Sequence, residues 1–134
     1  MVSFGIQTRD RFRAFPLDGA LLFFQPSSGT SLRIENGRTH SFRRQAPRVL
    51  MFGITNHCNL RCSFCSRDTA RASAWTVATA AELLRKLAAA GTLEVAFGGG
   101  EPFTFRGFNE LLSELHTTTL LALHVTTNGT LFDA

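Results

Sequence analysis

The three cysteines of this 134-residue chain stand within eight residues, as Cys58, Cys62 and Cys65 in the string CNLRCSFC. Thiolates at this C-x3-C-x2-C spacing lie on a loop short enough to curl around one metal centre, and the small and polar residues between them permit such a curl. Three cysteines distributed by chance would scatter along the chain. The spacing therefore predicts a metal centre, and it favours an iron–sulfur cluster.

Zinc and unligated structural cysteines are the alternatives. A structural zinc ion takes four ligands, and His57 is poorly placed to share a metal with the adjacent Cys58. The fourth zinc ligand would then come from His40, His116 or His124. Iron–sulfur clusters are usually held by four thiolates, so three thiolates leave one iron of a four-iron cluster without a protein ligand. Such an open position is where a substrate or cofactor binds and reacts.

Two further strings carry residues suited to ligand binding, GGGEP at 98–102 and TTNG at 126–129. Glycines let the backbone approach a ligand closely. A carboxylate or a backbone carbonyl suits an ammonium group. A plain strand-to-helix turn is the alternative interpretation of the first string, and an ordinary Asn-Gly turn is the alternative for the second.

The elements that must position these strings follow Pro47, where the character of the sequence changes. Residues 49–54 form a nearly continuous apolar run, which is typical of a strand buried on both faces. Thr79 and Glu82 form a capping-box pattern that predicts the start of a helix. That helix is expected to end at Gly91.

Two more strands are predicted at residues 92–97 and 120–127, separated by a helix with one apolar face. That face carries Phe108, Leu111, Leu112 and Leu115. Alternation at this spacing indicates right-handed crossovers, and hence an α/β fold with a parallel sheet and helices outside it. Because the carboxyl ends of parallel strands face one side, we expect the cysteines, GGGEP and TTNG at one edge of the sheet.

Together these strings resemble the signature of the radical S-adenosylmethionine (SAM) superfamily. CNLRCSFC matches its CxxxCxxC pattern with an aromatic residue before the last cysteine, and Gly99-Gly100-Glu101-Pro102 matches its GGE motif. The resemblance covers residues 48–134. It implies an oxidoreductase that uses a [4Fe–4S] cluster to cleave SAM to a 5′-deoxyadenosyl radical for hydrogen abstraction, and this chemistry belongs to the cofactors.

The resemblance also implies site residues. The implied metal ligands are Cys58, Cys62 and Cys65, with the amino and carboxylate groups of SAM on the fourth iron. The implied cofactor-binding residues are Phe64, Gly99, Gly100, Glu101, Pro102, Thr127 and Asn128. Phe64 would pack near the adenine, the Gly99–Glu101 segment would bind the methionyl amino group, and Thr127 and Asn128 belong to a turn that many members carry near SAM.

The family barrel typically has six βα units, and three are predicted here before Ala134. The expected fold is therefore α/β, the N-terminal half of a partial (β/α)6 barrel of the TIM-barrel kind. Exposed sheet edges on half a barrel are an aggregation hazard. We expect a truncated reading frame or an excised fragment, inactive alone; a split enzyme or a self-assembled pair of half barrels is the alternative.

Residues 1–47 are rich in turn formers and predict a small β-rich extension ahead of the core at residues 48–134. Asn36-Gly37 predicts a hairpin turn, with residues 38–42 as a weak returning strand. The extension is similar to the N-terminal segments of radical SAM maturases. A peptide or protein undergoing maturation is therefore the leading substrate hypothesis, ahead of a small molecule in cofactor biosynthesis.

Composition limits the functional classes and the cellular locations that fit this chain. With 44% hydrophobic and 18% charged residues, the chain is of globular type, and it shows no apolar run of signal-peptide length or of membrane-span length. We expect a cytoplasmic protein, where thiols stay reduced, and no binding to a membrane. We also expect no binding to nucleic acid, because no basic patch is interleaved with aromatic residues. A non-catalytic metal-binding interaction module is the rival function.

Charge is uneven, since residues 1–71 carry 11 Arg against four acidic residues, whereas residues 72–134 carry three basic residues against six acidic ones. Arg61, Arg67 and Arg71 surround the cysteines. They would dock an acidic flavodoxin or ferredoxin as electron donor or stabilise the negative charge of a cluster. A solvated surface is the alternative interpretation.

Overall fold

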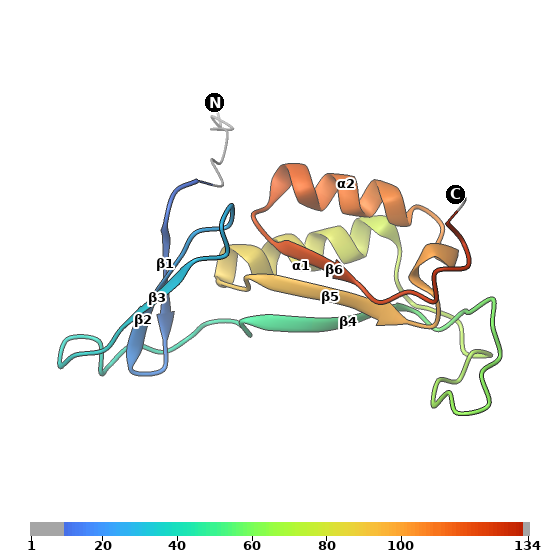
Figure 1. Ribbon diagram of the computed structural model, residues 1–134, viewed down its shortest axis with the longest axis horizontal. Coiled ribbons are helices and arrows are strands. Elements are labelled where there is room, and N and C mark those ends of the chain that lie inside the picture. The colour runs from blue at the N-terminus through green and yellow to red at the C-terminus, as the bar shows by residue number, and fades with distance from the viewer. Residues whose placement is uncertain (1–9, 133–134) are drawn as a thin grey trace.

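The structure, a computed structural model, describes residues 10–132. Strands β1 (Arg13–Leu17), β2 (Ala20–Phe24) and β3 (Ser31–Ile34) form an antiparallel sheet, and β4 (Val49–Thr55), β5 (Glu94–Gly99) and β6 (Ala122–Val125) form a second, parallel sheet. Helices α1 (Val77–Ala90) and α2 (Phe108–Thr118) link the parallel strands, with a short 3-10 turn η1 (Pro102–Thr104) before α2 (Figure 1). The predicted α/β fold with a parallel sheet is confirmed. Within residues 10–132, no helix is long and apolar enough to cross a membrane.

Helix α1 begins earlier than the sequence predicted. Thr76 is its N-cap, because Thr79 N donates to Thr76 Oγ1 at 3.2 Å and Thr76 N donates to Thr79 Oγ1 at 3.0 Å. The predicted capping box of Thr79 and Glu82 is wrong, since Glu82 instead pairs with Lys86 at 2.6 Å, which lowers the pKa of Glu82. The predicted end at Gly91 is confirmed by its left-handed φ of 113°.

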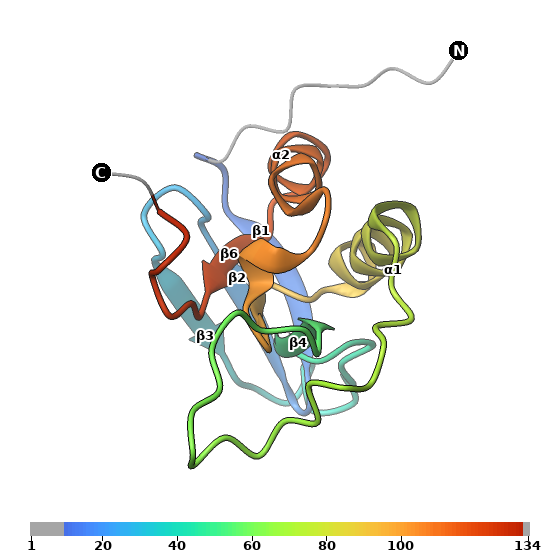
Figure 2. The ribbon, with the colours of Figure 1, turned by 90° about the vertical axis from the view of Figure 1, so that its right-hand side faces the viewer.

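Both helices cover the same face of the parallel sheet (Figure 2). Along β4, Phe52 and Ile54 are buried beneath them, whereas Val49 and Met51 on the opposite side are 49% and 84% exposed. The prediction that this strand is buried on both faces is therefore wrong, because no described element covers its second face. We name that side the open face; it carries Val49, Met51 and Gly53 of β4, Glu94, Ala96 and Gly98 of β5, and His124 of β6.

The core lies between the helices and the sheet. Leu84 of α1, Leu111 and Leu115 of α2 and Val95 and Phe97 of β5 have no exposed surface. Fully burying one such side chain contributes about 1.5–3 kcal/mol. The strand predicted at 92–97 is shifted by two residues to the observed β5, and the strand predicted at 120–127 is shortened at both ends to the observed β6. The loops that carry the three strings follow the strands of this packed layer.

The antiparallel meander confirms that the N-terminal extension is β-rich, but its turns differ from the prediction. The β1–β2 hairpin closes through Asp18 and Gly19, with Gly19 at a φ of 78°. The predicted hairpin at Asn36-Gly37 is wrong: Asn36 Oδ1 accepts from Arg38 N at 2.8 Å, and residues 38–42 form turns. Thr39 Oγ1 donates to Gly19 O at 3.0 Å, which folds this segment back onto the first hairpin.

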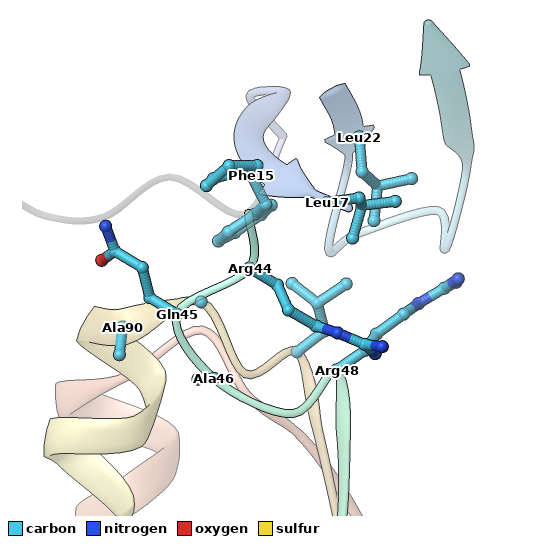
Figure 3. A pocket seen from close by; sticks show the side chains of 11 residues that line it. Phe15, Leu17, Leu22, Arg44, Gln45, Ala46, Arg48 and Ala90 are labelled. Carbon is cyan, nitrogen blue, oxygen red and sulfur yellow. The ribbon is translucent and has the colours of Figure 1, made fainter. Parts of the chain in front are cut away.

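The meander packs at the amino-terminal end of the parallel strands. Phe15, Leu22 and Phe24 form a small core with Leu93, which precedes β5. Figure 3 shows Phe15, Leu17 and Leu22 on one side of the loop at residues 44–46 and Ala90 on the other, around a cavity of about 10 Å³. The contact between the meander and the parallel sheet therefore leaves almost no empty space. It lies at the opposite end of the sheet from the loop that follows β4 (Figure 1). The division near Pro47 stays a prediction.

Candidate functional site

The loops that follow β4, β5 and β6 meet at the carboxyl edge of the parallel sheet (Figures 1 and 2). The first carries the cysteines, the second begins with Gly100 and Glu101, and the third contains Thr126 to Gly129. Their convergence follows from the parallel pairing of the three strands, in which Phe52 lies opposite Phe97 and Phe97 opposite Val125. The predicted gathering of all three strings at one edge is confirmed.

The cysteine loop presents its thiols outward. Cys58 is partly buried, Cys62 and Cys65 are exposed, and all three are free. Cys65 N donates to Cys62 O at 3.1 Å, which makes a turn between these two cysteines. Every residue from 59 to 72 is exposed. Within residues 10–132, no three His, Cys, Asp or Glu side chains stand close enough to hold a metal ion. The loop thus offers three thiols at one edge without gathering their sulfurs around a point.

The glycine turn brings two loops into direct backbone contact. Gly100 N donates to Thr55 O at 2.8 Å, and Glu101 N donates to His57 O at 2.9 Å. A Cβ on Gly100 would lie 2.1 Å from His57 O and 2.6 Å from Asn56 O, so no side chain fits there. Gly99 also has a left-handed φ of 120°. The double glycine is therefore required to dock the β5 loop against the start of the cysteine loop.

Glu101 is 1% exposed, and its carboxylate is fully engaged within the protein. Oε1 accepts from Thr127 Oγ1 at 2.9 Å and from Phe103 N at 3.1 Å, and Oε2 accepts from Asn128 N at 2.8 Å. A buried carboxylate needs such donors to offset the loss of hydration. Glu101 thus joins the end of β5 to the turn after β6 and caps η1.

The turn after β6 is in turn tied to the cysteine loop. Asn128 Nδ2 donates to Asn59 Oδ1 at 2.9 Å and reaches Cys58 Sγ at 3.9 Å. Asn59 Nδ2 donates to Thr130 Oγ1 at 2.7 Å. Leu60 N also donates to Cys58 Sγ, at 3.4 Å. The sequence did not mark Asn59 or Thr130, because no local pattern shows which amides meet across about 70 residues of chain.

Removal of the Glu101 charge is expected to destabilise the fold. In Glu101→Gln, a side-chain NH2 group replaces one acceptor oxygen and faces donors, so at least one buried hydrogen bond is lost. We expect the free energy of unfolding to fall by about 2–3 kcal/mol, as measured by chemical denaturation. Glu110→Gln, at an exposed glutamate in the first turn of α2, is the matched control and should lower stability by less than about 1 kcal/mol. Equal effects of both variants would contradict this role for Glu101.

The remaining residues implied for cofactor binding differ in their exposure. Phe64 is 89% exposed, next to Cys65. Pro102 is buried at the first position of η1. Thr127 bonds internally, accepting from Gly129 N at 3.0 Å besides donating to Glu101. Of the implied residues, Phe64 presents the largest free apolar surface.

A pocket of about 200 Å³ lies on the open face beside the cysteine loop. It is lined by Met51, Phe52, Gly53, Arg67, Ala96, Phe97, Gly98, Gly99 and Thr126. Sequence reasoning did not identify it. The available signal was the small residues at alternating positions, Gly53 in β4 and Ala96 and Gly98 in β5, which leave one side of the sheet without bulk.

The residues present suit an iron–sulfur centre in ligand type. Three free thiols stand on one exposed loop. Leu60 N and Asn128 Nδ2 direct N–H groups at Cys58 Sγ, and such donors to sulfur stabilise a thiolate ligand and tune a cluster. Every residue from 59 to 66 is exposed, so no buried contact of these residues opposes a curl that would draw the three sulfurs together. The chain therefore suits an iron–sulfur cluster by the type of its ligands and by the exposure of the loop that carries them.

Sequence comparison finds similar proteins whose names are those of enzymes. The probable GTP 3′,8-cyclase of Methanocella arvoryzae is 38% identical over 87 residues, which is 63% of this chain and 28% of that protein. The GTP 3′,8-cyclase of Synechocystis is 33% identical over 90 residues, 64% of this chain and 28% of that protein. The 7-carboxy-7-deazaguanine synthase of Clostridium acetobutylicum is 34% identical over 74 residues, 54% of this chain and 34% of that protein.

Solved structures share the fold. Streptococcus suis SuiB bound to S-adenosylmethionine superposes with a TM-score of 0.72 at 14% identity, over 94% of this chain and 42% of SuiB. SuiB bound to the precursor peptide SuiA gives a TM-score of 0.69 at 15% identity, over 94% of this chain and 43% of SuiB. At this identity the likeness concerns the fold alone, and it extends to most of the chain, the meander included.

The chain spans less than half the length of these relatives, about 28% of the two cyclases and 42% of SuiB. The family model of the Radical SAM superfamily matches residues 52–134, which include both the cysteine string and the Gly-Gly-Glu turn. The resemblance seen in the sequence is confirmed. With more than half of its residues matched, together with this site geometry, the chain belongs to the radical SAM superfamily.

Proposed function

We propose that this chain is the cofactor-binding half of a radical SAM enzyme. Cys58, Cys62 and Cys65 would hold a [4Fe–4S] cluster, and SAM would bind at the same edge of the sheet. When bound, these cofactors would supply the one-electron reductive cleavage of SAM to methionine and the adenosyl-derived radical that abstracts hydrogen from a substrate. The observation that carries the proposal is the hydrogen-bonded connection of all three loops, from Glu101 to Asn128 and from Asn128 to Asn59.

The chain's own residues have distinct tasks in this proposal. The thiolates bind iron, and the N–H groups of Leu60 and Asn128 hold Cys58 Sγ in place. Since the Glu101 carboxylate is occupied by Thr127, Phe103 and Asn128, we assign the binding of the methionyl ammonium to backbone carbonyls of the Gly99–Gly100 turn. Phe64 is exposed and free to pack against the adenine.

Cluster loading is tested by anaerobic reconstitution with iron and sulfide, followed by absorption and electron paramagnetic resonance spectroscopy. The expected result is a reduced four-iron signal that changes when SAM is added. Tight zinc binding without cluster formation would contradict the proposal and support a non-catalytic metal-binding module instead. Limited proteolysis before and after loading checks the curling of residues 59–66, which should become protected.

We further propose that the complete enzyme is a partial (β/α)6 barrel of which this chain forms the N-terminal half. The uncovered open face supports this proposal, because Met51 and Val49 would then face a barrel interior instead of solvent. The substrate would approach the cofactors across this face. Activity is accordingly proposed for the completed barrel.

For the substrate, we propose a peptide or protein. The support is the fold shared with SuiB, whose structure was also solved with a precursor peptide and whose match includes the N-terminal meander. A purine nucleotide is the second candidate, because the GTP 3′,8-cyclases are the sequence relatives at up to 38% identity. A change in the SAM-dependent spectrum of the reduced cluster on addition of GTP, but not of ATP, would favour the nucleotide.

An acidic flavodoxin or ferredoxin is proposed as the electron donor. Arg61 and Arg71 are exposed on the cysteine loop and would attract such a partner at long range. We expect reduction of the cluster by flavodoxin to slow by about tenfold between low and high salt, because salt screens the attraction. The rate is measured by stopped-flow absorption, with dithionite as a control reductant. A salt-insensitive rate with flavodoxin would remove the docking role.

A further inference from the structure

The Arg67 guanidinium lies over the open face without a neutralising partner. It sits against Gly53, where an added Cβ would be 3.2 Å from Nη2 and 3.3 Å from Nη1. Its hydrogen bond goes to the neutral Asn56 Oδ1 at 3.4 Å. Within residues 10–132, Arg67 enters no ion pair, and none of the residues lining its pocket is acidic.

The neighbouring loop residues do not supply an anion either. Asp68 follows Arg67, but its Oδ1 accepts from Ala70 N at 3.1 Å and closes a local turn. Apolar side chains and glycine backbone form most of the other walls of the pocket, with Met51, Ala96 and Gly98 among them, and Thr126 is the one uncharged polar residue among the described residues that line it. A single directional cation set in apolar walls is the usual pattern of a site that orients one anionic group of a ligand.

We propose that Arg67 binds a carboxylate of the substrate on the open face, next to the cofactor edge. One guanidinium matches one carboxylate as a two-pronged donor. A triphosphate carries several negative charges, and no second cation lines this pocket. The inference rests on the proposed function, in which the substrate approaches across this face, and it adds that the peptide presents an acidic side chain close to the reacting position.

The space for this group comes from two glycines. Gly53 lets the guanidinium lie flat on β4. Gly98 has no atom within 4 Å of the place where a Cβ would stand, so that place is open. A side chain at residue 98 would therefore fill the pocket without displacing protein atoms. Gly98 thus provides a way to block the pocket while keeping the charge of Arg67.

The test uses the cluster-free full chain labelled with 15N and two small probes, N-acetyl-glutamate N-methylamide and its neutral glutamine analogue. The amides of Gly53 and Gly98 are followed by NMR during titration. We expect the glutamate probe to bind with a Kd of about 1–10 mM, typical of a small ligand with one strong contact. The glutamine probe should bind at least about tenfold more weakly. Equal shifts with both probes would overturn the proposal.

Two variants and a matched control sharpen the result. Arg67→Gln and Gly98→Val should each weaken binding of the glutamate probe by about tenfold or more. Arg71→Gln removes the same charge from an exposed position on the same loop that does not line the pocket, and it should bind like the unaltered chain. Unaltered binding in Arg67→Gln, or equal losses in Arg67→Gln and Arg71→Gln, would overturn the assignment.

Two further experiments identify which anion binds Arg67, and they separate this inference from the proposed function. Tripolyphosphate binding through Arg67 more tightly than the glutamate probe would replace the carboxylate with a phosphate ligand. In the reconstituted chain, the Kd for SAM should be the same with Arg67 and with Arg67→Gln; a tenfold weaker SAM affinity would assign Arg67 to the SAM carboxylate. Normal cluster and SAM signals without probe binding would defeat only this inference, whereas absence of the cluster would defeat the proposed function.

Discussion

Replacement of Cys58, Cys62 or Cys65 by Ala is expected to abolish assembly of the four-iron cluster. Only three thiolates are available in the chain, so loss of any one leaves two irons without a protein ligand. Iron bound after anaerobic reconstitution should fall at least about tenfold from about four per chain, and the reduced paramagnetic signal should disappear. Iron analysis and the spectrum of the same sample measure both effects.

The matched controls for this prediction are Ser63→Ala and Ser66→Ala, which alter exposed residues of the same loop and remove no thiol. Both should load iron like the unaltered chain. Circular dichroism should be the same for all five variants, because Cys58 lies outside the core cluster and residues 59–72 are exposed. Full cluster formation in any of the three cysteine variants would show that the ligand set is wrong.

Gly100→Ala is expected to destabilise the chain by about 3 kcal/mol or more. The new Cβ would stand 2.1 Å from His57 O and 2.6 Å from Asn56 O. Both contacts are with backbone, which cannot swing aside as a flexible side chain can. The loops after β4 and β5 would have to separate, which breaks the bonds from Gly100 N to Thr55 O and from Glu101 N to His57 O. Chemical denaturation measures the loss.

Gly98→Ala is the control for this prediction, since it adds the same methyl group two residues away. Neither Gly98 nor Gly100 has a positive φ, so backbone strain does not distinguish them. The added Cβ at residue 98 meets no atom within 4 Å, and the free energy of unfolding should change by less than about 1 kcal/mol. If both variants were equally stable, close backbone contact would not explain the double glycine.

The sequence predicted the order of elements after Pro47 because strand and helix periodicities are local. It placed the second strand end at the glycines and the end of α1 at Gly91, where a left-handed residue is needed. It was wrong at the start of α1, since two threonines cap a helix as well as a threonine and a glutamate do, and the pattern alone did not choose between them.

The face pattern of β4 shows a second limit. A run of apolar residues predicts burial on both faces, yet Met51 is 84% exposed. An apolar side chain is stabilised by burial, but whether it is buried depends on which other elements pack against it. In the proposed complete barrel, Val49 and Met51 would face an interior, and the run in the sequence is consistent with that environment.

The hairpin prediction at Asn36-Gly37 failed for a related reason. An Asn-Gly pair favours several kinds of turn, and here a tertiary contact selects one of them. Thr39 is 5% exposed, and its bond to Gly19 O holds residues 36–42 against the first hairpin. Residues 38–42 consequently form turns instead of a returning strand.

The sequence by itself determined the family of this protein, because cysteine spacing, the glycine pair and the alternation of elements are short-range properties that can be read along the chain. Only the tertiary structure decided how these parts are joined. The buried Glu101 carboxylate connects the end of β5 to the turn after β6. Asn59 bonds to Asn128, and the Arg67 guanidinium lies against Gly53. Those contacts join residues far apart in the chain, and they arise because parallel strands bring their carboxyl ends to one edge.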